Sequence, residues 1–129
     1  MCLKIVEGSS LTFDSNRSVI CYKVYEVVID RLWSVYMHAP IYSAGVVLSD
    51  RSSTEITSEE QSSLEVNNGI HVYLEEKDCH GGLMQFYRVV PVQCKLEDLV
   101  AIGEFDGTKS AVFTKVEITK EEWNKAVNG

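Results

Sequence analysis

Residues 18–30 read SVICYKVYEVVID, the longest stretch rich in apolar residues in the chain. If this stretch is extended, apolar side chains fall on both of its sides. One side carries Ile20, Tyr22, Val24 and Val28, and the other carries Val19, Cys21, Tyr25, Val27 and Ile29. A strand with apolar groups on both faces is covered on both faces, so the pattern predicts a central strand over residues 18–29.

Shorter apolar runs on both sides of this stretch predict further strands. We expect strands at LKIV near the start and over residues 45–50, 69–76, 84–94, 99–105 and 110–119. The turn signal Asp106–Gly107 predicts that the last two pair as an antiparallel hairpin. Pro91 has no backbone N–H, so it predicts an edge position or a bulge for 84–94. Connections this short leave no room for crossover helices, which argues against a regular βαβ fold.

Two stretches are expected to lie outside the strands. Residues 31–45 contain Pro40 and Gly45, and they predict a loop or irregular edge with one helical turn around 32–37. Residues 51–68 are rich in serine, threonine, glutamate and asparagine. They predict a mobile loop, or a short exposed helix capped by Thr57 or Ser58.

The C-terminal segment has the pattern of a helix over residues 119–127. Thr119 followed by Glu122 is a capping-box spacing, and Trp123, Ala126 and Val127 can share one face. At 129 residues the chain has the length of one domain. The fold class predicted for residues 1–129 is therefore α+β and strand-rich: a twisted, mostly antiparallel sheet or open barrel with a short C-terminal helix.

Charge and composition exclude several classes of protein. The formal net charge is −7, from 19 acidic and 12 basic residues. This argues against direct nucleic-acid binding and against docking on an anionic membrane. No signal-peptide pattern and no run of about 18 apolar residues is present, so we expect a cytoplasmic protein. We then expect its four cysteines to be reduced thiols, with Cys21 and Cys94 as small buried apolar groups.

The stretch GIHVYLEEKDCHGG at residues 69–82 raises the question of a reactive cluster. Cys79 and His80 are adjacent, so their side chains tend to diverge, and no fourth metal ligand is evident. A Cys79–His71 dyad lacks a third orienting group. We therefore expect a strand followed by a turn, with no catalytic residue, metal or cofactor. An alternative stays open: His71, Tyr73 and Glu75 share one strand face, and they could bind a nucleotide or sugar if that face lines a cleft.

Two other groups of residues are candidates for binding a protein. Residues 33–42 are the most aromatic stretch, and Trp and Tyr dominate the energetics of protein interfaces. The candidates there are Trp33, Tyr36 and Tyr42. The acidic candidates, which would face a basic partner, are Glu55, Glu59, Glu60 and Glu65.

The order of several motifs resembles small bacteriophage and prophage proteins that have a GIHV-type strand. The resemblance is carried by Gly69–Val72 and by the later tract with Val90, Val92, Asp98, Val100, Ala101 and Gly103. It implies an origin in a mobile element or its bacterial host, and it transfers no activity and no site residue. Small acidic phage proteins often bind and block a host protein.

These observations lead to three hypotheses. The first is a non-enzymatic, acidic protein-binding module of phage origin that inhibits a host or defence protein, for example at its basic nucleic-acid-binding surface. The second is a small-ligand or nucleotide-binding protein, or a nucleotide-handling enzyme, with a cleft near His71 and Tyr73. The third is an accessory phage protein that acts through oligomerisation, for example as a homodimer.

Overall fold

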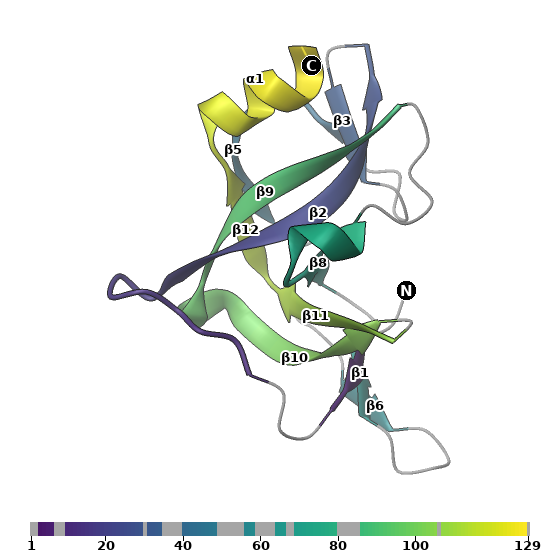
Figure 1. Cartoon of the computed structure of the whole chain (residues 1–129), viewed down its shortest axis with the longest axis vertical. Helices are drawn as coiled ribbons and strands as arrows, with labels where there is room; N and C mark the ends of the chain where they lie inside the picture. Colours follow the sequence, from purple (N-terminus) through teal and green to yellow (C-terminus); the bar gives the residue numbers. More distant parts are fainter. Residues whose placement is uncertain are drawn as a thin grey trace.

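The computed structural model of the chain describes residues 3–6, 10–29, 31–34, 40–48, 56–58, 64–66, 69–79, 86–105 and 107–128. In this part of the chain, 12 strands form one antiparallel sheet that is not closed, and a helix ends the chain (Figure 1). The strands are β1 (Leu3–Ile5), β2 (Ser18–Val28), β3 (Arg31–Ser34), β4 (Pro40–Ile41), β5 (Gly45–Leu48), β6 (Ile56–Ser58), β7 (Leu64–Val66), β8 (Ile70–Tyr73), β9 (Tyr87–Lys95), β10 (Leu99–Phe105), β11 (Thr108–Phe113) and β12 (Lys115–Ile118). Two 3-10 turns, η1 (Glu76–Cys79) and η2 (Leu96–Asp98), and the helix α1 (Lys120–Asn128) complete the described elements.

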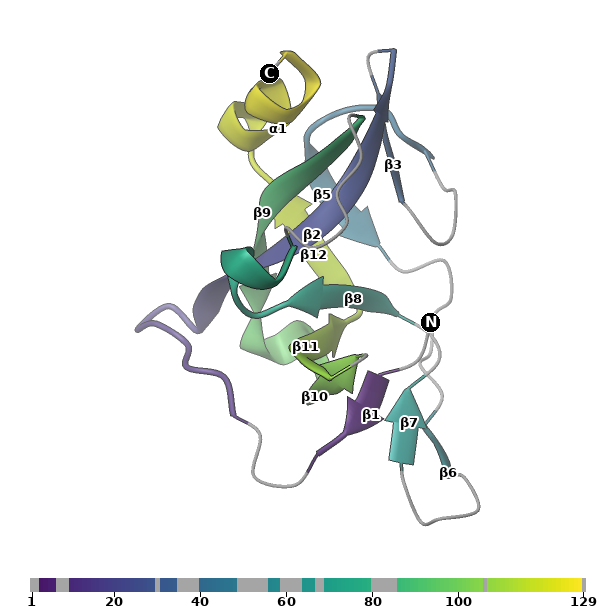
Figure 2. The same ribbon diagram turned by 45° about the vertical axis from the view of Figure 1, so that its right-hand side comes forward.

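The strand order is β5-β12-β9-β2-β8-β11-β10-β1-β7-β6, and β3 branches from β2 and pairs with β4. Figure 2 shows β1, β7 and β6 together at one end, and α1 and the β2–β3 hairpin at the other. The prediction of a strand-rich, antiparallel fold with one C-terminal helix is confirmed.

The longest ladder joins β2 to β9. Nine residue pairs run from Ser18↔Lys95 to Glu26↔Tyr87. The Val27 N–H donates to the Phe86 carbonyl at 2.8 Å, which extends the ladder at one end. The predicted central strand is therefore confirmed, except at Ile29, which lies in the turn after β2. Alternation places Cys21 and Tyr25 on the core face, where both are fully buried.

Pro91 is not in an edge strand, because β9 lies between β2 and β12. The prediction of an edge position for this segment was wrong, and the register explains why. Gln93 is the residue of β9 that pairs with β12, at Glu117. Backbone groups two residues apart point to the same edge of a strand, so the Pro91 nitrogen faces the β12 side. The missing N–H therefore falls where β9 has almost no ladder with its neighbour.

The main core lies on one face of the sheet and is built from β2, β3, β8, β9, β11, β12 and α1. Its largest fully buried side chains include Tyr25, Phe113, Leu32 and Ile118. A second, smaller cluster joins Leu3 of β1 to Val112 of β11. Both faces of β11 are therefore buried, as expected for a strand with a continuous apolar run.

The segment after Asp106 forms the predicted hairpin but changes partners midway. β11 pairs with β10 and β8, whereas β12 pairs with β5 and β9. The change occurs at Thr114, whose N–H donates to the Asp98 carbonyl at 2.9 Å. Because β11 and β12 are consecutive in the chain and separate in the sheet order, the sheet must bend between them.

Two predicted loops contain strands. Residues 31–34 form β3, since pairing with β2 through Val28↔Arg31 completes a hairpin whose loop has only two residues. Within residues 51–68, the described parts 56–58 and 64–66 are the paired strands β6 and β7. β7 also pairs with β1. Tertiary pairing thus overrides the polar composition of this stretch, and Thr57 and Ser58 do not begin a helix. The remainder of 51–68 lies outside the described residues.

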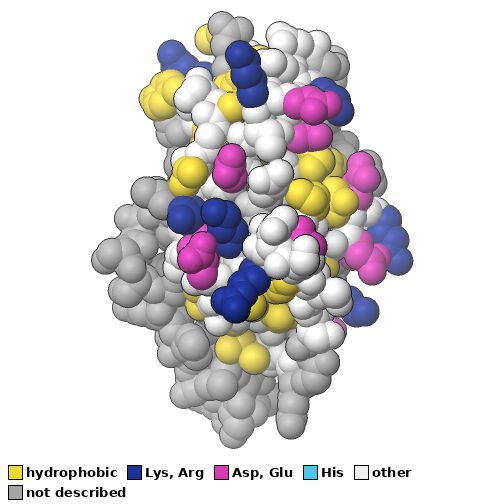
Figure 3. Space-filling view, turned by 90° about the vertical axis from the view of Figure 1, so that its left-hand side faces the viewer, with side chains coloured by type: hydrophobic (Ala, Val, Ile, Leu, Met, Phe, Trp, Pro, Cys, Tyr) yellow, Lys and Arg dark blue, Asp and Glu magenta, His cyan; other side chains and the backbone are white. Residues whose placement is uncertain are grey.

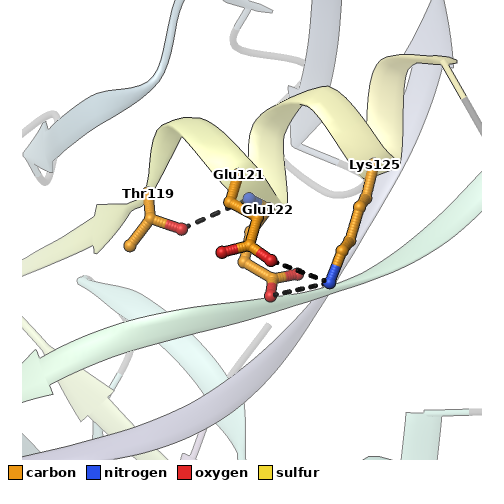
Figure 4. Close-up of polar contacts among 4 residues, drawn as sticks. All are labelled: Thr119, Glu121, Glu122 and Lys125. Carbon is orange, nitrogen blue, oxygen red and sulfur yellow. Dashed lines mark hydrogen bonds and ion pairs between the residues drawn. The ribbon is translucent and has the colours of Figure 1, made fainter.

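The C-terminal helix forms as its capping pattern predicts. The Glu122 N–H donates to the Thr119 hydroxyl oxygen at 3.2 Å, and Lys125 pairs with Glu121 at 3.4 Å and with Glu122 at 3.8 Å (Figure 4). Ala126 is buried, and Trp123 and Val127 pack against the main core. The helix is therefore held by its apolar face, with the cap fixing where it begins.

Gly103 gives a direct test of the β1–β10 contact. A Cβ at this position would overlap the backbone carbonyl of Lys4, whose strand pairs there through Ile5↔Gly103. We expect Gly103→Ala to lower the free energy of unfolding by about 3 kcal/mol, because backbone atoms must move apart. Urea denaturation would measure this change.

Gly107→Ala is the matched control for Gly103→Ala. Gly107 has φ of +80° and nothing within 4 Å of an added Cβ, so its substitution carries only left-handed backbone strain. That strain is about 1 kcal/mol. Equal losses in the two variants would contradict the close approach of β1 to β10.

Candidate functional site: the edge of β2 between β8 and β3

The two edges of β2 differ in how they are paired. One edge pairs with β9 along its whole length. The other edge pairs with β8 only at Tyr22↔Tyr73 and with β3 from Tyr25 onward. In the described part of the chain, no strand pairs with this edge at Lys23 or Val24. In the β2–β3 register the position opposite Val24 is residue 35, which lies outside the described residues. We name the part of this edge at Lys23 and Val24 the β2 gap.

Backbone directions show which groups face the β2 gap. The Val27 N–H bonds to Phe86 on the β9 side, so the odd-numbered residues of β2 point their backbone groups to β9. Val24 therefore points its N–H and C=O into the gap. On β8, Tyr73 faces β2, and His71, two residues earlier, directs its carbonyl to the same edge.

Lys23 spans the β2 gap with its side chain. Its ammonium donates a hydrogen bond to the His71 carbonyl at 3.0 Å, which joins β2 to β8 beside their residue pair Tyr22↔Tyr73. The same nitrogen lies 5.7 Å from the centre of the Tyr25 ring, a cation–π distance. No carboxylate of the described residues forms an ion pair with Lys23.

The surroundings of Lys23 are apolar. It lies between Cys21 and Tyr25 on the core face of β2, opposite Val90 of β9. Burial removes water from the ammonium and lowers the pKa of Lys23 from its usual 10.5 to about 8. At neutral pH the group is thus a cation held at the edge of an apolar core, a costly arrangement without an anionic partner.

Tyr25 adds a second unusual polar group beside Lys23. Its side chain is fully buried, and its hydroxyl has no hydrogen-bond partner among the residues that the structure describes. Burial, and to a smaller extent the Cys94 thiol, raise the pKa of Tyr25 above its usual range, so the phenol stays protonated and can donate. Arg88 of β9 is in register with Tyr25 and therefore shares this face of the sheet.

His71, Tyr73 and Glu75 do not form one exposed polar face. His71 is only 6% exposed, and its Nδ1 lies 3.3 Å from the Gly69 carbonyl. Tyr73 is half-buried and in register with Ser110 of β11. Glu75 is exposed and pairs with Lys77 at 3.0 Å. Of the predicted ligand cleft, the structure brings only the His71 backbone to the β2 gap.

Cys79 is a poor candidate for a nucleophile. It is buried in η1, and burial, followed by the charges of Asp78 and Glu76, raises the pKa of its thiol to about 12. A thiol in this state is not activated for attack. Among the described residues, no group of three His, Cys, Asp or Glu side chains could hold a metal ion. His80 lies outside the described residues.

A second feature lies at the tip of the β2–β3 hairpin. Ile29 has φ of 57° and is 84% exposed. Phe86, bonded through its carbonyl to Val27, is 61% exposed. Tyr42, 65% exposed, carries the Arg31 guanidinium 4.7 Å from its ring centre. Phe86 is in register with Val27 and so lies on the other face of the sheet from Val28 and Arg31. We call Val28, Ile29, Arg31 and Tyr42 the hairpin patch.

The predicted protein-binding residues are placed only in part. Tyr42 belongs to the hairpin patch, whereas Trp33 is half-buried and its buried Nε1–H has no partner in the described part of the chain. Glu65 lies in β7 in register with Lys4. Tyr36, Glu55, Glu59 and Glu60 lie outside the described residues. On the face shown in Figure 3, the described acidic and basic side chains are interspersed and form no continuous acidic field.

Sequence reasoning missed Lys23 and Ile29 as functional candidates. Lys23 was visible as a charge on the apolar side of a predicted central strand, between Cys21 and Tyr25. Ile29 looked like the last apolar residue of that strand. Its position in a tight turn follows only from the pairing of β3, which the sequence did not predict.

Comparisons with known proteins add no relative to this description. No protein family, no curated protein and no solved structure matches the chain. In the part of the chain that the structure describes, none of the helices has the length and apolar character needed to cross a membrane.

The cost of burying Lys23 gives a prediction with a defined sign. Between pH 8 and 10.5 the unfolded chain keeps a proton that folded Lys23 has released, so this residue makes stability rise with pH. Over this pH range the free energy of unfolding should rise by about 3 kcal/mol through Lys23. We expect Lys23→Met to stabilise the fold at pH 7 and to remove this rise.

The measurement is the free energy of unfolding of both proteins at several pH values. The raised pKa values of Cys79 and Tyr25 act in the opposite direction above pH 9, because the unfolded chain then loses protons first. The contribution of Lys23 is therefore read from the difference in free energy of unfolding between wild type and Lys23→Met at each pH. A difference that does not change with pH would show that Lys23 titrates normally.

Proposed function

We propose that this protein is a protein-binding module, and that the hairpin patch is its contact surface. The observation that carries the proposal is Ile29, which is both conformationally strained and almost fully exposed. Neither property helps the isolated chain to fold.

The strain follows from the geometry of the turn. Val28 and Arg31 are paired, so Ile29 is the first residue after the paired part of β2 in a hairpin with two positions between its strands. Such loops favour Asn or Gly, because their backbone enters the left-handed region. Isoleucine is β-branched and costs about 1–2 kcal/mol there. An exposed isoleucine in this conformation therefore stabilises nothing within the chain, and its side chain is available to a partner.

The neighbours of Ile29 have the composition of an interface centre. Tyr and Arg are the residue types, with Trp, that contribute most to binding energy. Arg31 and Tyr42 are stacked on each other, which orders both side chains before any partner arrives. Val28, 39% exposed, adds apolar area next to Arg31, with which it is paired.

The chemistry of the proposed partner follows from the charge of the chain. With a net charge of −7, the protein attracts basic surfaces over distance. We therefore propose a partner with an apolar pocket that receives Ile29, set in a basic surface. The phage-type resemblance favours a host or defence protein, whose activity the binding would inhibit. Glu55, Glu59, Glu60 and Glu65 are the acidic residues proposed to strengthen this attraction.

We also propose that the bent sheet is arranged as an open barrel that supports the hairpin. The support for this arrangement is that β11 and β12, consecutive in the chain, are separated by three strands in the sheet order.

Ile29→Asn should separate binding from folding. Asparagine tolerates the left-handed conformation. We therefore expect the free energy of unfolding of this variant to be about 1 kcal/mol higher than that of the wild type. Thermal and urea unfolding would measure the change. If Ile29→Asn were less stable than the wild type, the claim that Ile29 is strained would be contradicted.

The same variant should bind the partner more weakly than the wild type does. An affinity capture from bacterial lysate, followed by identification and by binding of the purified pair, should show at least about tenfold weaker binding for Ile29→Asn. The matched control is Val46→Thr, which changes a 58% exposed apolar residue on β5. The wild-type complex should also weaken as salt increases. Equal binding by the two variants, or burial of the hairpin patch in a homodimer, would contradict the proposal.

A further inference from the structure

We propose that Cys21 and Cys94 are a redox-sensitive pair, which hydrogen peroxide oxidises to a disulfide between β2 and β9 and which glutathione opens again. The bond crosses the ladder that joins the two strands, so the oxidised protein resists unfolding more strongly than the reduced one. This modification is separate from protein binding by the hairpin patch.

The first observation is the register of β2 and β9, which lie side by side (Figure 1). Cys21 pairs with Val92, and Cys94 pairs with Val19, so the two cysteines are diagonal neighbours on the same face of the sheet. Both are free thiols. The fold therefore brings together two thiols that are separated by more than half of the chain.

The second observation is that the two side chains touch. The thiols of Cys21 and Cys94 are hydrogen-bonded to each other. The Cys94 thiol also donates to the carbonyl of Val92, the residue opposite Cys21, at 3.8 Å. Because the two sulfurs are already neighbours in the folded protein, a bond between them needs a short movement and no rearrangement of the fold.

The spacing of the two strands makes this disulfide easy to reduce. Diagonal neighbours in an antiparallel pair have Cα atoms about 7–8 Å apart. Disulfides usually join Cα atoms up to about 6.8 Å apart, so closing this one draws the two strands together. In the described ladders β9 pairs with β12 at Gln93↔Glu117 alone, so little backbone pairing on that side resists the movement. Strained disulfides of this kind are the labile ones that serve regulation.

Cys79 is a comparison within the same chain. It is buried as well, but the charges that act on its thiol come from Asp78 and Glu76 rather than from a second cysteine. Among the described cysteines, oxidation to a disulfide should therefore select Cys21 and Cys94.

The reaction balances with hydrogen peroxide as the oxidant. One thiolate attacks a peroxide oxygen and becomes a sulfenic acid, and the hydroxide that leaves takes up the thiol proton as water. The second thiol attacks the sulfenic sulfur, the S–S bond forms and a second water leaves. Both thiols are fully buried, and their hydrogen bond, followed by burial, raises the pKa of Cys94 above its usual range. The first attack therefore follows local opening of the ladder.

The test is oxidation of the folded, full-length protein by hydrogen peroxide, read by mass spectrometry of the intact chain and of its peptides. We expect the loss of two hydrogens and a peptide pair joined through Cys21 and Cys94. Urea denaturation should give the oxidised protein an unfolding equilibrium constant at least about tenfold lower than that of the reduced protein, because the bond closes a long loop. Reduced glutathione should restore both thiols.

Two variants connect the result to the pair. Cys94→Ala should form no disulfide under the same treatment, and peroxide should not raise its stability. Cys79→Ala is the matched control and should form the bond as fast as wild type. The proposal is overturned if the folded protein keeps both thiols under conditions that oxidise the urea-unfolded chain, if a different pair of cysteines is joined, or if glutathione leaves the bond intact.

Discussion

The structure depends on the continuous ladder between β2 and β9. A strand that is paired along one whole edge has a fixed direction for every side chain and every backbone group. The ladder therefore sets which residues of β2 enter the core and which backbone groups face the opposite edge. A register shift of one residue would expose Cys21 and Tyr25 and bury Glu26. The core, the β2 gap and the hairpin tip all follow from this single pairing.

Lys23 in β2 and Ile29 in the turn after it depart from what stability alone favours. Lys23 is a charge on the core side of the strand, and Ile29 is a β-branched residue in a left-handed turn. Natural sequences are locally consistent with their fold at most positions, and departures concentrate where function is served. Here the two departures lie six residues apart, and each is accompanied by a further feature. For Lys23 this is the orphan hydroxyl of Tyr25, and for Ile29 it is the exposed pair of Arg31 and Tyr42.

Much of the fold could be predicted from the sequence, because its signals are local. The alternation in 18–28, the hairpin around Gly107 and the capping pattern at Thr119 each specify their own element. β3, β6 and β7 could not be predicted, since their polar or irregular sequences become strands only through distant partners. The edge position predicted from Pro91 was wrong for the same reason. Whether a proline removes a ladder hydrogen bond depends on which edge of β9 is paired, and that depends on distant strands. Of the candidate site, His71 was singled out for its imidazole, yet its backbone carbonyl is the group that meets Lys23.

Amide hydrogen exchange tests the central claim most directly, because it reads the pairing of β2 one residue at a time. The amides of Lys23 and Tyr25 face β9 and should exchange only when the whole protein unfolds. The amides of β5, a four-residue strand at the end of the strand order, should exchange at least about 100-fold faster. Exchange of the Lys23 and Tyr25 amides as fast as that of the β5 amides would contradict the account, because the β2–β9 ladder would then not be the pairing on which the rest of the structure depends.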